Sequence, residues 1–111
     1  MRRGTTPTNR FITNLDLRDA KEAYMSYAQD EEVIFEKTLE DMVIKEINVE
    51  CGEETITKYL IKIKLSQEET LSLSTEMPVE IHCRPVYPDG TVPSCPIIRV
   101  PVERILKEGV I

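Results

Sequence analysis

Alternation of apolar and polar side chains with a period of two residues runs through most of the chain and restricts it to β-structure. The clearest case is ITKYLIKIKL at residues 56–65, where Tyr59, Ile61, Ile63 and Leu65 alternate with three lysines and a leucine. Successive side chains of a strand point to opposite faces of its sheet. We therefore expect a half-buried antiparallel strand whose outer face carries lysines, which also discourage edge-to-edge association.

The same spacing recurs in other segments, separated by turn residues every 8–12 positions. In the segment 33–38 it places Val33 and Phe35 on one face, and in the segment 78–87 it aligns Cys83 with two apolar residues. Seven short strands with this spacing indicate an antiparallel β-sandwich with no second domain. The strands are expected at residues 8–14, 22–29, 33–38, 42–50, 56–65, 78–87 and 92–106, and the prolines of the last one mark it as broken or as an edge strand.

Two local motifs stand out from the strand pattern. In SQEETLSLS (66–74), Ser66 and Glu69 have the spacing of a capping box, which predicts a turn or two of helix with Leu71 or Leu73 in the core. In YPDGT (87–91), Pro88 and Gly90 suit the central positions of a tight turn. The second motif predicts a short hairpin loop with an exposed tip at Asp89 and Gly90.

Charge and cysteine usage limit the classes of function. The 111 residues carry a formal net charge of −6, which argues against a general nucleic-acid binder because such proteins need a basic stripe. No segment approaches the roughly 20 apolar residues of a membrane span, and no apolar stretch follows the basic N-terminus as in a signal peptide. Three cysteines without a C-x-x-C pair favour cytosolic synthesis with reduced thiols.

The only histidine lies near two cysteines and an acid, which raises the hypothesis of a metal or catalytic site. The candidate residues are Cys51, His82, Cys83, Asp89 and Cys95. His82 and Cys83 are adjacent in a predicted strand, so their side chains point to opposite faces and do not share one ion or form a nucleophile–base pair. We expect Cys83 to be a buried free cysteine, His82 to be exposed, and Asp89 to serve the turn.

Other catalytic patterns give no stronger signal. The chain has no G-x-S-x-G, no glycine-rich phosphate loop and no H-E-x-x-H. The paired carboxylates DEE, LED, GEE and QEE fall in predicted turns, and none has the ligand spacing of a calcium loop. We therefore expect no enzymatic activity, no metal, no cofactor and no small-molecule substrate.

The order of these features resembles a family of virus proteins. RFITNLDLRDAKEAYMSYAQDEEVIFEKT, IKIKLSQEETLSL and VEIHCRPVYPDGTVPSCPIIRVPV follow the path of a strand, a DLxxA turn, a hairpin, a strand with a capped turn, and a strand pair around a DG turn. This is similar to small immunoglobulin-like structural proteins of tailed phages and prophages of Gram-positive bacteria, and in particular to the N-terminal domain of phage baseplate upper proteins. DLRDA lacks the glycine usual at that turn, and NVECGEETITKYL is longer than the pattern needs.

The resemblance implies an immunoglobulin-like fold and a structural or assembly role in a phage particle, with other phage structural proteins and further copies of the chain as partners. It also implies a location in the virion, or in the bacterial cytoplasm during assembly. The net charge and the lack of a long apolar segment lead us to expect no nucleic-acid and no membrane partner. The N- and C-terminal segments are similar to those of the short prophage proteins, so we expect a complete stand-alone protein. A carbohydrate- or host-surface-binding module is the alternative, although the chain has no Trp to stack on a sugar.

Charge asymmetry suggests where partners bind. Ten acidic residues lie between Asp30 and Glu54 against two lysines, whereas the first ten residues carry three arginines. We predict that residues 1–8 form a flexible basic arm that docks on a neighbour, and that residues 105–111 form a C-terminal tail. The predicted partner-binding residues are Arg2, Arg3, Arg10, Phe11, Asp89 and Gly90.

Overall fold

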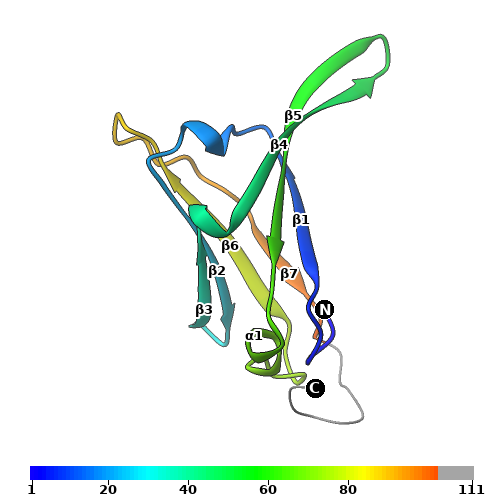
Figure 1. The fold of residues 1–111 in the computed structure, drawn as a ribbon, viewed down its shortest axis with the longest axis vertical. Coiled ribbons are helices and arrows are strands. Elements are labelled where there is room, and N and C mark those ends of the chain that lie inside the picture. Colours follow the sequence, from blue (N-terminus) through cyan, green and yellow to red (C-terminus); the bar gives the residue numbers. More distant parts are fainter. Residues whose placement is uncertain (103–111) are drawn as a thin grey trace.

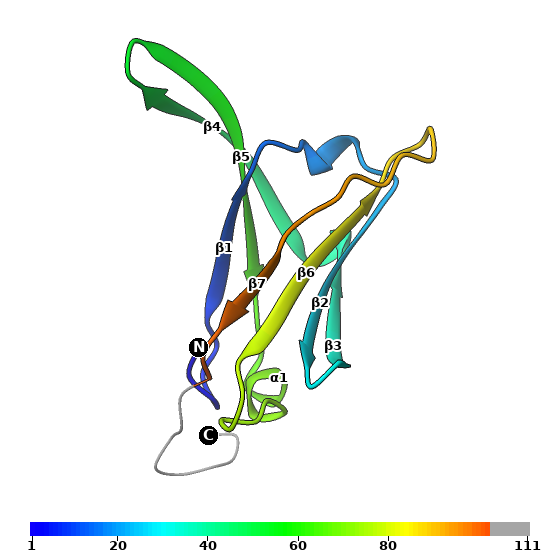
Figure 2. The same ribbon diagram turned by 180° about the vertical axis from the view of Figure 1, so that it is seen from behind.

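Two antiparallel sheets face each other in the computed structural model, which describes residues 1–102 (Figure 1, Figure 2). The first sheet has the order β1 (Thr8–Thr13), β5 (Glu54–Lys64), β4 (Met42–Cys51). The second has the order β3 (Glu32–Thr38), β2 (Glu22–Gln29), β6 (Val79–Val86), β7 (Ile97–Val100). Helical structure is limited to two single turns, η1 (Leu17–Asp19) and η2 (Leu39–Asp41), and to the short helix α1 (Gln67–Leu71). The all-β sandwich with one short helix is confirmed.

The strand order is that of an immunoglobulin-type sandwich without its first strand. If β1 to β7 are named B, C, C′, D, E, F and G, the sheets read B-E-D and C′-C-F-G. Both sheets join strands that are distant in sequence, since β1 pairs with β5 and β2 pairs with β6. The connections that cross between the sheets bring the inward faces of all strands onto one core.

Most of the core consists of side chains on the inner faces of the strands, as the alternation predicts, and Leu17 and Leu73 join it from outside the strands. Burial removes these apolar groups from water and supplies the main stabilising term. Cys83 lies at the border of this core, half-buried, on the inner face of β6. The buried apolar residues are Leu17, Ala23, Met25, Tyr27, Met42, Ile61, Ile63, Leu65, Leu73, Val79, Ile81 and Val102.

A β-bulge in the hairpin of β2 and β3 changes one predicted face. Tyr27 pairs with Phe35 but the next residue, Ala28, pairs with Val33, so Ile34 is the extra residue of the bulge. Phe35 therefore points inward, where its ring stacks on that of Tyr27 with the centroids 4.5 Å apart. Val33 points outward and is 53% exposed. The prediction that Val33 and Phe35 share a face is wrong, because one inserted residue reverses the alternation.

The turn of the same hairpin holds two residues in the left-handed backbone region. Asp30 has φ 51° and Glu31 has φ 64°, and Gln29 pairs with Glu32 on either side of them. A two-residue loop with positive φ at both positions is a type I′ turn, which glycine fits at the second position. Glu31 therefore occupies a backbone conformation that a side chain disfavours.

Replacing Glu31 with glycine is expected to raise the free energy of unfolding by about 0.5–1 kcal/mol, because the steric cost of positive φ disappears. Chemical denaturation followed by circular dichroism measures the change. Glu32→Gly, one residue further in the strand, is the matched control and should destabilise by a similar amount. A similar loss of unfolding free energy in both variants would show that the turn stores no strain.

The N-terminal segment corrects the prediction of a flexible arm. The ammonium group of Met1 donates to the carbonyl of Pro101 at 2.6 Å, and Arg3 Nη2 donates to the carbonyl of Leu71 at 2.7 Å. The hydroxyl of buried Thr70 donates to the carbonyl of Thr5 at 2.9 Å. These bonds hold residues 1–7 against α1 and the end of β7, since the backbone groups there find partners within the chain. The predicted tail at residues 105–111 lies outside the described residues.

Helix α1 begins at the predicted capping box. Ser66 Oγ accepts from the backbone N–H of Glu69 at 3.1 Å, and the carboxylate of Glu69 accepts from the backbone N–H of Ser66 at 2.9 Å. Lys37 on β3 reaches the same carboxylate, with Nζ 2.7 Å from Oε1. Leu73, just after the helix, is buried as expected, whereas Leu71 is only partly buried. The helix therefore closes one end of the sandwich.

The connection from β6 to β7 is longer than the predicted hairpin loop. Within YPDGT, Gly90 donates to the carbonyl of Tyr87 at 2.9 Å and Tyr87 donates to that of Thr91 at 3.0 Å, so the tight turn is present. Strand pairing, however, begins only at His82 and Ile97. Pro93 and Pro96 lack the N–H groups that a ladder needs, which explains why β7 is confined to four residues at the edge of the sheet.

Candidate functional site

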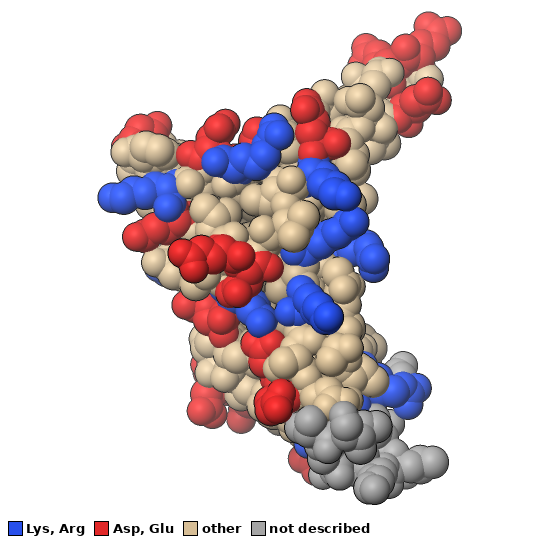
Figure 3. Space-filling model, viewed as in Figure 1, with Lys and Arg blue, Asp and Glu red and all other residues tan. Residues whose placement is uncertain are grey.

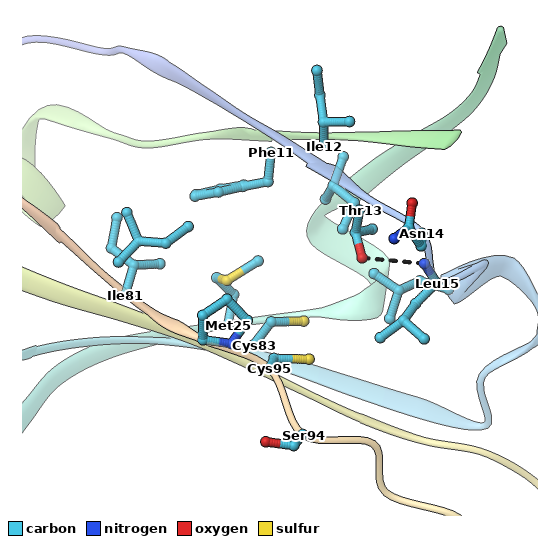
Figure 4. A pocket seen from close by; sticks show the side chains of 14 residues that line it. Phe11, Ile12, Thr13, Asn14, Leu15, Met25, Ile81, Cys83, Ser94 and Cys95 are labelled. Atoms are coloured by element: carbon cyan, nitrogen blue, oxygen red, sulfur yellow. Dashed lines mark hydrogen bonds between the residues drawn. The ribbon is translucent and has the colours of Figure 1, made fainter. Parts of the chain in front are cut away.

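The residues of the predicted metal or catalytic cluster lie in different parts of the molecule. His82 lines a hollow on the outer face of the second sheet, whereas Cys83 faces the space between the sheets. Cys51 is exposed at the end of the β4–β5 hairpin, and Asp89 is exposed at the tip of the loop after β6. The face assignment of His82 and Cys83 is confirmed. Only Cys95 joins Cys83, because the loop from β6 folds back beside that strand (Figure 4).

Cys83 and Cys95 lie at the side of an apolar pocket of about 340 Å³ at the open edge of the sandwich. Phe11 of β1 and Met25 of β2 form parts of its wall, and the loop around Pro96 forms another (Figure 4). Burial and the neighbouring Cys95 raise the pKa of the Cys83 thiol to about 12. Burial also raises the pKa of Cys95. Both sulfurs are therefore protonated near neutral pH and are poor nucleophiles.

Thiol labelling of the folded protein is expected to separate the three cysteines. Cys51 is exposed and should react with an aromatic disulfide reagent rapidly at pH 8, whereas Cys83 and Cys95 react only as fast as the pocket opens. Cys51→Ser should remove the fast phase, and Cys83→Ser should leave it unchanged. A fast phase that survives Cys51→Ser would show that the pocket thiols are reactive.

The hollow beside His82 is lined mainly by polar and charged side chains. It has a volume of about 260 Å³ and lies across β2, β3 and β6. Tyr24 Oη donates to Glu22 at 3.0 Å, and Ser26 Oγ donates to Glu36 at 3.0 Å. The hydrogen bond to Glu22 raises the pKa of Tyr24. The two carboxylates of the hollow, those of Glu22 and Glu36, are thus already engaged with neighbouring hydroxyls.

The β4–β5 hairpin is the most prominent feature of the surface. β1 pairs with β5 only from Tyr59 to Lys64, so the hairpin beyond Lys58 pairs only with itself. Figure 1 shows this outer part projecting away from the two sheets. Between Asn48 and Thr57 every residue is exposed except Val49, which is partly exposed. We call residues 48–57 the arm.

The arm ends in a group of carboxylates. Gly52 and Glu53 form the two-residue turn between the paired residues Cys51 and Glu54, and Gly52 takes the positive φ of 67°. Glu50, Glu53 and Glu54 are all exposed here and form what we call the acidic tip, which is red at the end of the projecting hairpin in Figure 3. No lysine or arginine lies within the arm.

The outer face of the first sheet has the opposite charge. Cross-strand pairing aligns Arg10, Lys62 and Val43 in one row and Ile12, Leu60 and Lys45 in the next. Figure 3 shows lysine and arginine side chains gathered on the front of the molecule, over β1, β4 and β5. Repulsion from Lys45, together with burial and Arg10, lowers the pKa of Lys62. This surface, called the cationic face below, consists of Arg10, Lys45, Lys58, Lys62 and Lys64.

The predicted partner-binding residues have different positions. Arg10 lies on the cationic face, and Asp89 and Gly90 are exposed at a loop tip as expected. Phe11 instead lines the pocket and packs on the core, since it faces inward on β1. Arg2 and Arg3 belong to the N-terminal segment described above.

The sequence reasoning missed the arm, although a signal for it exists. The residues of the arm that share the inner face of the hairpin are polar, whereas the same face of β5 nearer the core carries isoleucines. A strand that is polar where its continuation is apolar has left the core. The inner-face residues of the arm are Asn48, Glu50, Thr55 and Thr57.

Comparison with protein-family models, with curated proteins and with solved structures gives no match. Among residues 1–102, no group of three or more histidine, cysteine or acidic side chains is placed to hold a metal ion. No helix in the same range is both long and apolar enough to cross a membrane.

Proposed function

We propose that this protein is a non-enzymatic assembly component of a tailed-phage or prophage particle. The observation that carries the proposal is the arm, a pair of strands that extends beyond the sandwich and packs on no other part of the described chain. Ordering a strand pair in water costs roughly 1–2 kcal/mol per residue in backbone entropy, and isolated hairpins are marginal. A neighbour that packs on the arm would stabilise it.

Two further observations support an assembly role. The thiols of the pocket are protonated and without a basic partner among the residues that line it. The immunoglobulin-type strand order agrees with the family that the sequence resembles. Sandwiches of this kind present loops, edges and hairpins on a rigid body, which suits them to hold neighbouring subunits.

The test is incorporation into particles. Prophages of the bacterium that encodes the chain are induced, the particles are purified by density gradient, and the chain is quantified by mass spectrometry. We expect the chain to co-purify with the particles at a fixed ratio to their major tail or head protein. A chain that remains entirely in the soluble fraction would refute the proposal.

A shortened variant provides the matched comparison. Replacing residues 48–57 with Asn-Gly joins the paired residues Ile47 and Lys58 through a favourable type I′ turn and leaves the sandwich intact. This variant is expected to fold, as judged by circular dichroism, but to be absent from particles. Its normal incorporation would show that the arm is not the contact.

A carbohydrate-binding function is the second candidate, and the polar hollow beside His82 favours it. Tyr24 there offers an aromatic ring next to hydroxyl and carboxylate groups, the combination that orients sugars. A glycan array of the folded protein tests this function. Tyr24→Ala should abolish any binding at this site, and an array without signal excludes it.

A further inference from the structure

We propose that copies of this chain associate head to tail, with the acidic tip of one copy seated on the cationic face of the next. The inference deepens the proposed function and rests on it for its biological setting, because it names a second copy of the chain as one neighbour. The acidic tip lies at the turn of the β4–β5 hairpin. The cationic face lies at the other end of that hairpin and on the neighbouring strand β1.

The cationic face carries charge that residues 1–102 do not neutralise. Among residues 1–102, none of its five side chains forms an ion pair with a carboxylate; the ion pairs join Arg18 to Asp16, Lys37 to Glu69, and Arg99 to Glu80. Like charges directly opposite each other on a sheet destabilise it. An acidic surface placed over Lys45 and Lys62 relieves that repulsion, which favours association.

Exposed apolar residues lie between the charges on both surfaces. On the cationic face, Ile12 is 61% exposed and Val43 is 55% exposed, although both are large and apolar. Beside the acidic tip, Ile56 is 38% exposed and pairs with Val49 on the same face of the arm. An apolar centre with a charged rim is the usual composition of a protein interface. The two surfaces therefore carry opposite charges, and both contain exposed apolar side chains.

The acidic tip reaches the cationic face of another copy and not its own. The tip and all of the cationic face except Arg10 belong to one continuous hairpin, whose outer end points away from the two sheets (Figure 1). A contact between two different surfaces of identical chains is heterologous, so repetition gives either a closed ring or an open chain. Rings and stacked repeats are arrangements that an assembly component can adopt.

Sedimentation velocity with charge-reversed variants tests the contact. At about 0.05 M salt, where screening is weak, the wild type should form larger species as its concentration rises, and about 0.5 M salt should reduce this association. The tip variant E50K/E53K/E54K and the face variant R10E/K45E/K62E should each raise the dissociation constant at least about tenfold. An equimolar mixture of the two should associate again, because each then offers a surface complementary to the other.

A matched variant separates this contact from general effects of net charge. D30K/E31K/E32K reverses three exposed carboxylates at the β2–β3 turn and should associate like the wild type. Carbodiimide coupling of isotope-labelled with unlabelled copies should join carboxylates of the tip to Lys45 or Lys62 between chains. A wild type that stays monomeric at every concentration, or a tip variant that associates normally, overturns the proposal. Particle incorporation of such a protein would still leave the proposed function standing.

Discussion

Ile63→Ala is expected to lower the free energy of unfolding by about 2–5 kcal/mol, since it removes buried methyl groups and leaves a cavity. Ile63 is fully buried near the C-terminal end of β5, which is the central strand of its sheet, and it pairs with Asn9 of β1 and Met42 of β4. Domains of this size have a total stability of roughly 5–15 kcal/mol, so the variant loses a large part of it. Urea denaturation followed by circular dichroism measures the loss.

Ile12→Ala is the matched control for this experiment. Ile12 lies in the same sheet and is the same residue type, but its side chain is 61% exposed on the outer face. Its replacement should change the free energy of unfolding by less than about 0.5 kcal/mol. A similar loss for both variants would contradict the assignment of the inner and outer faces.

Gln29→Leu is expected to destabilise the protein by about 1–3 kcal/mol, because it leaves partly buried backbone groups without their partners. Gln29 is 5% exposed, and its amide makes three hydrogen bonds to the loop after α1. Nε2 donates to the carbonyls of Ser74 at 2.8 Å and Met77 at 3.1 Å, and Oε1 accepts from the N–H of Ser74 at 2.8 Å. Leucine keeps most of the volume but provides none of these bonds.

The loss of stability predicted for Gln29→Leu affects the loop after α1 more than the rest of the protein. Amide hydrogen exchange of residues 74–77 should accelerate in the variant more than that of β5, since the side chain joins this loop to β2. Asn48→Leu, which removes an exposed amide on the arm, should leave the stability within about 0.5 kcal/mol of the wild type. Unchanged stability of Gln29→Leu would show that water replaces the amide.

Local alternation predicted most of the fold because burial follows the two-residue period of a strand. It placed Ile61 and Ile63 inside and separated His82 from Cys83. A different local signal, the spacing of Ser66 and Glu69, identified the capping box. The alternation failed at Ile34, where a bulge inserts one residue and reverses the faces of β3. The bulge depends on how β3 pairs with β2. The spacing of apolar residues within β3 alone does not reveal that pairing.

The candidate surfaces were less predictable, because they depend on which strands become neighbours. Arg10 and Lys45 lie far apart in the sequence, and only the order β1-β5-β4 brings them to one face. From composition alone, the basic residues near the N-terminus suggested that residues 1–8 form a flexible segment. Hydrogen bonds from Met1 and Arg3 to Pro101 and Leu71 hold that segment instead, and such long-range contacts leave no local pattern.

The pairing of distant strands also sets an order in which the chain is expected to fold. The β4–β5 and β2–β3 hairpins join neighbouring segments through two-residue turns, so their closure costs little loop entropy. The β1–β5 and β2–β6 pairings must close much longer loops, and such contacts make folding slow. We expect the two hairpins to form early and the sandwich to close late. During that interval, the charged ends of both hairpins protect their exposed edges from pairing with other chains.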